Sequence, residues 1–171
     1  MSEQNRKGRL IRLADEKETF LVAGLLGRTA SAGDVLLLTG GLGSGKTTFT
    51  AALARGLDVS AVVSSPSFAL LHEYQGRLPL YHLDLYRLAG EEDVEDAGLV
   101  EYLETSGVTV VEWPERLGGL RPESCLGLEF HILPGTAREI ILTPHGWSGE
   151  QWLRRFINLH QRKVDHEQAD H

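Results

Sequence analysis

The sequence predicts an α/β fold, in which a central mixed sheet with β-hairpins is flanked by helices. Residues 40–47 read Gly-Gly-Leu-Gly-Ser-Gly-Lys-Thr, the G-x-x-x-x-G-K-T pattern of a phosphate-binding loop. An apolar run of buried-strand type, residues 34–39, precedes this loop, and residues 48–55 follow it with helical composition. Further along the chain, short apolar runs flank turns that contain glycine, which is typical of hairpins. Together these observations predict a P-loop NTPase-type domain.

The elements before the loop follow from apolar spacing and capping residues. Residues 1–7 are polar and predict a frayed start, whereas residues 9–13 alternate well enough for an edge strand. Asp15 can cap a helix that ends between Arg28 and Gly33.

After the loop helix, which Gly56 can stop, the sequence predicts two hairpins, two short helices, one buried strand and a closing helix. They are the hairpin of residues 68–74 and 78–84 around 75–77, the helices of 91–98 and 99–105, the strand of 108–111, the hairpin of 126–133 and 138–143 around 134–135, and the helix of 149–160. Residues 1–160 would form the single domain, and the polar residues 161–171 a disordered tail.

Length and composition suit a soluble protein with one core. The longest unbroken apolar stretch, Phe20 to Gly27, is too short to span a bilayer, and the first residues show no secretory signal. Cys125 is the only cysteine, which excludes an internal disulfide and a cysteine-based zinc site. We therefore expect a cytoplasmic protein without membrane contact.

The charge balance limits what the chain can bind alone. Seventeen basic residues against 24 acidic ones give a net charge of −7. Because phosphate contacts supply most of the affinity for nucleic acids, this balance argues against a stand-alone nucleic-acid binder. A local basic patch remains compatible with it, but another protein should hold most of any nucleic acid.

The phosphate loop carries the strongest functional signal. Its glycines let successive backbone N–H groups turn toward one anion, and the helix N-terminus adds partial positive charge. Lys46 would reach the β- and γ-phosphates, and the Thr47 hydroxyl would bind Mg²⁺. The expected nucleotide-binding residues are Gly40, Gly41, Leu42, Gly43, Ser44, Gly45, Lys46, Thr47 and Thr48, joined by Trp113.

A phosphate loop also needs an acid near the end of an adjacent strand, to position Mg²⁺ or the attacking water. Asp84 closes the strand of residues 80–83, and Glu112 closes that of residues 108–111. Strand ends open at the ligand crevice of such sheets. We therefore expect at least one of the two carboxylates to hold Mg²⁺, directly or through water, although acids after strands also serve as caps or in salt bridges.

Other polar and aromatic residues near these positions are weaker candidates. His82 alternates with Asp84 and so points to the same face of its strand. Arg87 could reach a phosphate or pair with Asp84, and Trp113 could stack on a base or simply pack. Switch or partner contacts are expected from Ser65, Ser67, His82 and Arg87.

The ordered set of motifs resembles the bacterial TsaE (YjeE) family. After the loop come Ser65-Pro66-Ser67-Phe68, then Tyr81-His82-Leu83-Asp84-Leu85-Tyr86-Arg87, then Glu112-Trp113-Pro114-Glu115-Arg116. Thr19 and the pair Glu73-Tyr74 also fit, and the resemblance runs from about residue 10 to residue 143.

This resemblance implies a small ATPase that supports threonylcarbamoylation of adenosine in certain tRNAs. Family members work with the TsaB and TsaD proteins, so tRNA would be met only through that complex. It also implies that Lys46 and Thr47 bind phosphates and Mg²⁺, that Asp84 and Glu112 serve the metal and the hydrolytic water, and that Trp113 lies near the nucleotide.

Two residues depart from the family pattern. Gly41 stands where the family usually has Asp, so the backbone cradle is kept but a carboxylate is missing. Ser67 stands where the family usually has Thr, which retains the hydroxyl.

Three other interpretations share the phosphate loop. A small-molecule kinase would need a basic lid, for which Arg116 and Arg121 around residues 117–120 are available. A GTPase switch would use an N-K-x-D element, and neither Asn5 nor Asn158 is followed by Lys. The third is a nucleotide-gated binding module, whose hydrolysis only times the exchange of partners.

Overall fold

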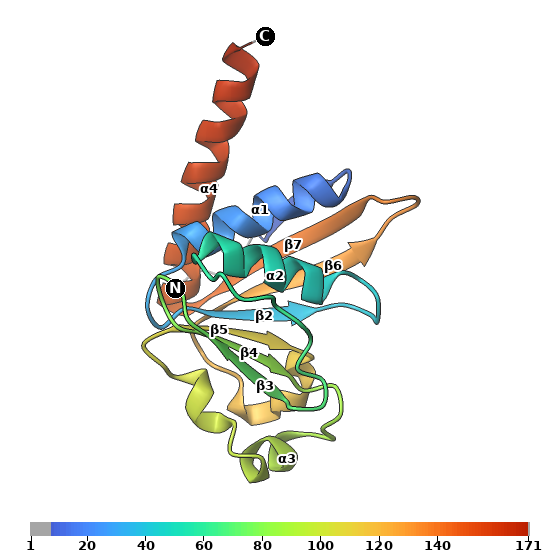
Figure 1. Cartoon of the computed structure of the whole chain (residues 1–171), viewed down its shortest axis with the longest axis vertical. Helices are drawn as coiled ribbons and strands as arrows, with labels where there is room; N and C mark the ends of the chain where they lie inside the picture. The colour runs from blue at the N-terminus through green and yellow to red at the C-terminus, as the bar shows by residue number, and fades with distance from the viewer. Residues whose placement is uncertain (1–7, 171) are drawn as a thin grey trace, which may run out of the picture.

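The computed structural model describes residues 8–170, so the expected frayed start at residues 1–7 lies outside the described part. Its core is one mixed sheet of seven strands in the order β1-β7-β6-β2-β5-β4-β3 (Figure 1). The strands are β1 Arg9–Leu13, β2 Val35–Thr39, β3 Leu71–Tyr74, β4 Leu80–Asp84, β5 Val108–Glu112, β6 Cys125–Ile132 and β7 Arg138–His145. The helices are α1 Glu16–Thr29, α2 Lys46–Gly56, α3 Glu91–Asp96 and α4 Gly146–Ala169, with the 3₁₀ helices η2 Val100–Leu103 and η3 Pro114–Leu120.

The centre of the sheet is parallel and its borders are antiparallel. Strands β6, β2, β5 and β4 run in one direction, whereas β1–β7, β6–β7 and β3–β4 pair antiparallel. The predicted edge strand and both predicted hairpins are therefore confirmed. In the register of β4 and β5, Asp84 is directly opposite Glu112, and Leu38 of β2 also pairs with Glu112. The carboxyl ends of β2, β4 and β5 thus meet at one edge, where the phosphate loop leaves β2.

Helices cover both faces of this sheet because the central strands are apolar on both sides. Leu36 and Leu38 of β2 pack with α1, α2 and α4 in one hydrophobic cluster. Val35 and Leu37 point the other way and pack with α3, η2 and η3 (Figure 1). This alternation along β2 buries the strand that carries the phosphate loop from both sides.

Helices α1 and α2 approach backbone to backbone. A Cβ atom at Gly56 would collide with the carbonyl oxygen of Gly24, and one at Gly27 with that of Leu53. Gly56, expected only as a stop signal, is the last residue of α2 and is required by this contact. The close approach packs α2, which follows the phosphate loop, tightly against α1.

Two predicted boundaries need correction. Helix α4 does not end at His160 but continues to Ala169, so residues 161–169 are helical rather than disordered. These residues are mostly good helix formers, and they are polar because this part of α4 is exposed, not because it lacks a helix. The first hairpin strand begins at Leu71 instead of Phe68, because Leu70 has a positive φ of 67° that interrupts the extended backbone.

Candidate nucleotide site

The phosphate loop is open on the side where an anion would lie. Gly43 and Gly45 have φ values of 72° and 106°, which glycine adopts without strain. A Cβ atom at Gly41, Gly43 or Gly45 would meet nothing within 4 Å. In contrast, a Cβ atom at Gly40 would lie 2.8 Å from Ser44 Oγ. The loop is therefore packed at its base and empty above, as a phosphate cradle requires.

Lys46 is held beneath the loop and is only 6% exposed. Its Nζ donates to the carbonyl oxygens of Gly40 at 2.5 Å and Gly41 at 3.1 Å, and it lies 4.2 Å from the ring centroid of Trp113. Burial lowers the pKa of Lys46, while the charges of Glu112, Glu115 and Asp84 raise it. An anion in the loop would add to the charges that favour the ammonium form.

Glu112 connects the phosphate loop to β4. Its Oε1 lies 3.5 Å from Thr47 Oγ1, and its Oε2 lies 2.7 Å from His82 Nε2. His82 is fully buried and Glu112 is 3% exposed. His82, expected on the same face of its strand as Asp84, reaches across to the neighbouring strand β5 and holds the Glu112 carboxylate in place.

Asp84 contacts the segment that precedes β3. Its Oδ2 accepts a hydrogen bond from Ser65 Oγ at 3.1 Å, and its Oδ1 accepts one from the backbone N–H of Tyr86 at 3.0 Å. Arg87 does not pair with Asp84 but lies over the ring of Phe68, 4.0 Å from its centroid.

These groups converge on one cleft of about 490 Å³ at the carboxyl edge of the sheet. Of the predicted site residues, only Gly40, Gly41 and His82 do not line it, and His82 lies behind Glu112. The lining residues are Leu42, Gly43, Ser44, Gly45, Lys46, Thr47, Thr48, Ser65, Ser67, Asp84, Tyr86, Arg87, Glu112 and Trp113.

A second hollow of about 400 Å³ lies on the other side of the loop and was not predicted from the sequence. It shares Gly45 and Thr48 with the cleft, and its other lining residues are Asp15, Glu16, Thr19, Phe130, Gly135, Thr136 and Arg138. Arg138 Nε also donates to the carbonyl oxygen of Ser44, at 3.3 Å. Gly45, Thr48 and Thr19 had been singled out in the sequence, but no sequence signal groups the lining residues into one hollow, because they come from distant elements.

The region considered as a kinase lid does not border the cleft. Residues 114–120 form η3, and the backbone N–H of Gly119 donates to Glu91 Oε2 at 2.9 Å, which ties the segment to α3. Neither Arg116 nor Arg121 lines the cleft.

A metal at this site would depend on mixed ligands. Within residues 8–170 no three His, Cys, Asp or Glu side chains group closely enough to hold a metal ion by themselves. The oxygen donors that line the cleft include Thr47 Oγ1 and the carboxylates of Asp84 and Glu112, which suit a hard ion that keeps water and phosphate ligands. In the same described part, no helix has the length and apolar character to cross a membrane.

Comparison with known proteins agrees with this geometry. The family model for "Threonylcarbamoyl adenosine biosynthesis protein TsaE" matches residues 13–140. The tRNA threonylcarbamoyladenosine biosynthesis protein TsaE of Bacillus subtilis is 42% identical over 136 residues, covering 79% of this chain and 85% of that protein. The protein of the same name from Treponema pallidum is 43% identical over 116 residues, covering 68% of this chain and 86% of that protein.

A solved structure extends the likeness to the fold. The crystal structure of Bacillus subtilis YdiB matches with a TM-score of 0.79 at 33% identity, covering 92% of this chain and 99% of that one. The motifs, the fold and these relatives agree over most of the chain. The chain therefore belongs to the TsaE family of threonylcarbamoyl adenosine biosynthesis proteins.

Proposed function

We propose that this chain is a Mg²⁺-dependent ATPase that supports threonylcarbamoylation of adenosine in tRNA, acting with the TsaB and TsaD proteins. The observation that carries the proposal is the contact between Thr47 of the phosphate loop and Glu112, beside the Lys46 ammonium in one open cleft. This arrangement brings together a phosphate cradle, a cation and a carboxylate, which are the parts that phosphoryl transfer to water needs.

ATP would lie across the loop, with its phosphates in the cleft. The Lys46 ammonium, now bonded to the carbonyl oxygens of Gly40 and Gly41, would turn to the β- and γ-phosphate oxygens. The base and ribose would enter the second hollow, because Gly45 and Thr48 border both spaces. Trp113 lines only the cleft, which favours a role beside Lys46 and the terminal phosphate rather than stacking on the base.

Thr47 and Glu112 are the residues that would hold Mg²⁺, together with phosphate oxygens and water. When bound, the ion would neutralise charge that develops on the phosphate oxygens. His82 fixes one oxygen of Glu112 and leaves the other beside Thr47, which favours Glu112 over Asp84 as the direct ligand.

Asp84 is then the group available to orient water. Water would attack the γ-phosphorus in line, forming the new P–O bond as the bond to the β-phosphate oxygen breaks and ADP leaves. The hydroxyl of Ser65 and the N–H of Tyr86 hold the Asp84 carboxylate in place. Ser65 lies on the non-helical segment before β3, so this contact links the site to that segment.

Exposed apolar side chains near the cleft favour a second function, that of a nucleotide-gated binding module. Leu42 is 69% exposed, Phe68 83% and Tyr86 42%. Leu42 and Tyr86 line the cleft, and Phe68 lies against Arg87, which lines it too. A partner that covered these side chains would bury apolar area and sense the nucleotide together.

The test is ATP hydrolysis with Mg²⁺, measured alone and with TsaB and TsaD of the same organism, while tRNA threonylcarbamoylation is scored in parallel. We expect partner-stimulated hydrolysis together with multi-turnover modification. Hydrolysis that appears only in the complex would favour the gated module. Hydrolysis indifferent to the partners, with modification indifferent to this chain, would contradict the proposal.

A further inference from the structure

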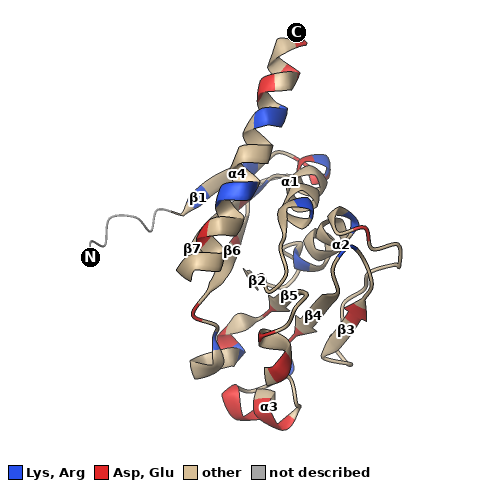
Figure 2. Cartoon of the chain, turned by 90° about the vertical axis from the view of Figure 1, so that its left-hand side faces the viewer, with Lys and Arg blue, Asp and Glu red and all other residues tan. Residues whose placement is uncertain are grey.

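The segment that joins α2 to β3 contributes side chains to the cleft, although it forms neither a helix nor a strand. Ser65 and Ser67 line the cleft, and Ser65 Oγ donates to Asp84 Oδ2 at 3.1 Å. Residues 64–70 of this segment are here called the cleft loop. Strand β3, which follows the loop, is the edge strand on the side of the sheet away from α4 (Figure 2). The position of Ser65 therefore depends on how the cleft loop is attached to the sheet.

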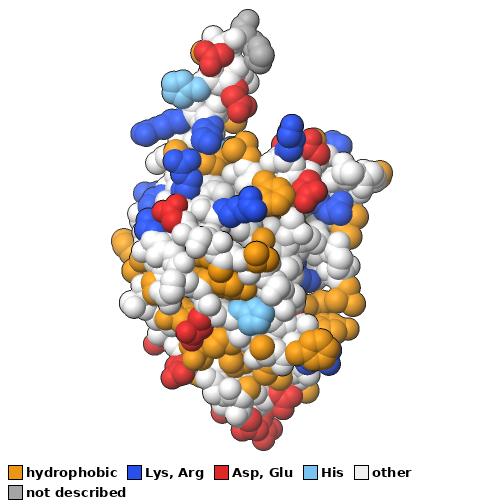
Figure 3. Space-filling view, in the orientation of Figure 1, with side chains coloured by type: hydrophobic (Ala, Val, Ile, Leu, Met, Phe, Trp, Pro, Cys, Tyr) orange, Lys and Arg blue, Asp and Glu red, His pale blue; other side chains and the backbone are white. Residues whose placement is uncertain are grey.

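The middle of the cleft loop is held only weakly by packing. Pro66 is buried, but Ala69 is exposed and the Phe68 side chain is 83% exposed. The Phe68 ring contacts the guanidinium of Arg87, 4.0 Å from the ring centroid. In Figure 3 hydrophobic side chains gather on the visible surface at the lower right, over the loops at the carboxyl ends of the strands. The loop is therefore fixed mainly at its two ends.

Backbone hydrogen bonds fix the carboxyl end of the cleft loop. The N–H of Leu70 donates to the carbonyl oxygen of Pro66 at 2.6 Å, which closes a turn. The N–H of Asp84 donates to the carbonyl oxygen of Leu70 at 3.0 Å. Leu70 has a φ of 67°, a conformation that costs energy for leucine and persists only where its surroundings impose it. The loop thus returns to the sheet directly beside Asp84.

Two side chains of β3 hold the amino end of the cleft loop. The backbone N–H of Ser64 donates to Tyr74 Oη at 3.3 Å. His72 Nδ1 lies 3.2 Å from the same oxygen and 3.3 Å from the Ser64 carbonyl oxygen. With a proton on Nδ1, His72 donates to the Ser64 carbonyl oxygen, and without one it accepts from the Tyr74 hydroxyl. Tyr74 and His72 are two residues apart on one strand, so their side chains share a face and meet at Ser64.

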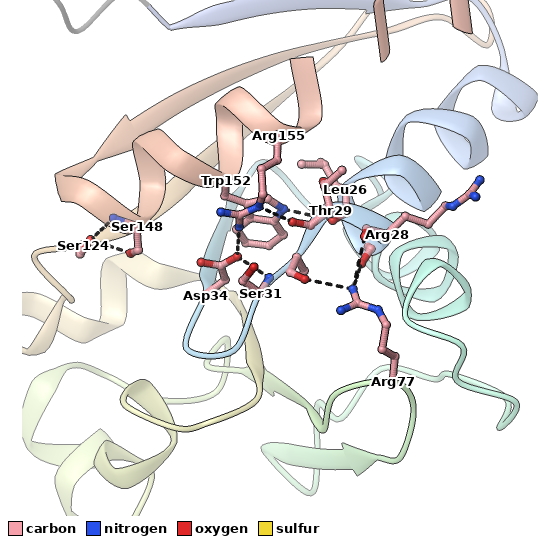
Figure 4. A network of polar contacts seen from close by, with 12 residues as sticks. Leu26, Arg28, Thr29, Ser31, Asp34, Arg77, Ser124, Ser148, Trp152 and Arg155 are labelled. Atoms are coloured by element: carbon pink, nitrogen blue, oxygen red, sulfur yellow. Dashed lines mark hydrogen bonds and ion pairs between the residues drawn. The ribbon is translucent and has the colours of Figure 1, made fainter. Parts of the chain in front are cut away.

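Strand β3 gives these contacts a fixed support. The side chain of Tyr74 is 8% exposed and packs in the hydrophobic cluster with α1 and α2. In the turn after β3, Arg77 Nη2 donates to the carbonyl oxygens of Gly27 at 2.9 Å and Ala30 at 3.0 Å, at the end of α1 (Figure 4). The backbone N–H of Arg77 donates to the carbonyl oxygen of Leu57 at 2.6 Å. The hairpin is thus tied to both helices, and Tyr74 has little freedom to move.

Core packing accounts for the ring of Tyr74 but not for its hydroxyl group. A phenylalanine ring would occupy the same place in the hydrophobic cluster, whereas a hydroxyl group adds a polar atom that needs a partner. The partners of this hydroxyl group are Ser64 and His72. The hydroxyl group therefore serves the cleft loop rather than the core.

We propose that Tyr74, supported by His72, is a positioning residue for the cleft, which holds Ser65 where its hydroxyl group orients the Asp84 carboxylate. This inference rests on the proposed function, in which Asp84 orients the attacking water. Ser64 and Ser65 are adjacent, so a shift of the Ser64 backbone moves the Ser65 hydroxyl group directly. Tyr74 does not itself line the cleft, so its effect is on turnover rather than on the affinity for ATP.

A double-mutant cycle tests this role. Tyr74→Phe removes the hydroxyl group and leaves the ring, and it is compared with Ser65→Ala and with the double variant. ATP hydrolysis with Mg²⁺, in the presence of TsaB and TsaD, gives kcat and KM for each protein. Tyr102→Phe is the matched control, because it removes the hydroxyl group of a half-buried tyrosine on the other face of the sheet. Hydrogen–deuterium exchange of residues 64–70, measured by mass spectrometry without nucleotide, is an independent readout.

We expect Tyr74→Phe to lower kcat by about three- to tenfold and to change KM by less than about twofold, because an outer contact acts on orientation. The double variant should be no slower than Ser65→Ala alone, since both changes act through the same contact with Asp84. Exchange in residues 64–70 should be at least about threefold faster in Tyr74→Phe, since the loop opens more often. Tyr102→Phe should match the unmodified chain in all of these measurements.

Losses of kcat that multiply in the double variant would overturn the proposal, because Tyr74 would then act independently of Ser65. Unchanged exchange in Tyr74→Phe, faster exchange without a loss of kcat, or an equal loss in Tyr102→Phe would overturn it as well. If the unmodified chain hydrolysed no ATP, the proposed function would fail. The exchange comparison contains no nucleotide, so it would still decide whether Tyr74 holds the cleft loop.

Discussion

His82 Nε2 lies 2.7 Å from Glu112 Oε2, and the two side chains are 0% and 4% exposed. The contact joins β4 to β5 at the edge of the sheet where the phosphate loop begins. His82 Nδ1 has no hydrogen-bond partner among the described residues, so this one contact determines how the ring is used. By occupying one oxygen of Glu112, His82 leaves the other beside Thr47. We therefore assign His82 as a positioning residue for the site.

His82→Ala should lower kcat for ATP hydrolysis by at least about tenfold, because residues that orient a ligand side chain have effects of this size. KM for ATP should change less, since the phosphate loop itself is intact. His82→Gln keeps a donor and should restore part of kcat. If both variants lost activity equally, in proportion to a lower Tm, His82 would have only a packing role.

Lys46→Ala should remove the only Lys among residues 8–170 that lines the cleft. We expect ATP binding to fall sharply and hydrolysis by at least about a hundredfold, because a preorganised charge at the phosphates is lost. Isothermal titration with a non-hydrolysable ATP analogue separates binding from turnover. Unchanged activity in this variant would mean that the site is assigned wrongly.

Glu112→Ala should reduce hydrolysis more than nucleotide binding, since its carboxylate faces Thr47 rather than the base of the loop. Glu112→Gln is the matched variant, because it preserves size and the contact with His82 while removing the charge. Hydrolysis rates and ATP affinity would be measured for both at several Mg²⁺ concentrations. A variant that lost affinity alone would assign Glu112 to ground-state binding or to structure.

The phosphate loop and its flanking strand and helix were predictable because all their signals are local. The positions of Asp84 and Glu112 at strand ends were also predicted, although only the strand order explains why the two residues lie side by side. That order places β5 between β2 and β4, so Glu112 reaches both Thr47 and His82. Pairings of this kind depend on distant segments, which a single sequence does not reveal.

Other features of the structure were not predicted from the sequence, for related physical reasons. The second hollow is assembled from α1, the phosphate loop, β6 and the β6–β7 turn, and nothing local in the sequence shows that these distant segments meet. Residues 161–169 were predicted to be disordered because they are polar. They form an exposed part of α4, and an exposed helix lacks the periodic apolar residues by which a helix is recognised in a sequence. Trp113, which has a positive φ of 59°, is placed on Lys46 by backbone geometry that composition does not indicate.

Cys125 should react slowly with thiol reagents in the folded protein. Its side chain is 1% exposed, and burial raises the pKa of the thiol while the charge of Arg121 acts in the opposite direction. Because the thiolate is the reactive form, we expect labelling by DTNB at pH 8 to be at least about tenfold slower than in urea. With one cysteine in the chain, the signal has no background. Equal rates in buffer and urea would show that the β6 end of the core opens readily.

Gly56→Ala should destabilise the protein, although alanine is the better helix former. The added Cβ would collide with the carbonyl oxygen of Gly24, so α1 and α2 would have to move apart. We expect a loss of about 1–3 kcal/mol in the free energy of unfolding, which is typical of overpacking. Urea denaturation followed by circular dichroism measures it. Gly41→Ala is the matched control, because a Cβ there meets nothing within 4 Å and should leave the unfolding midpoint unchanged. Equal midpoints for the two variants would mean that the contact between the helices is looser than the structure has it.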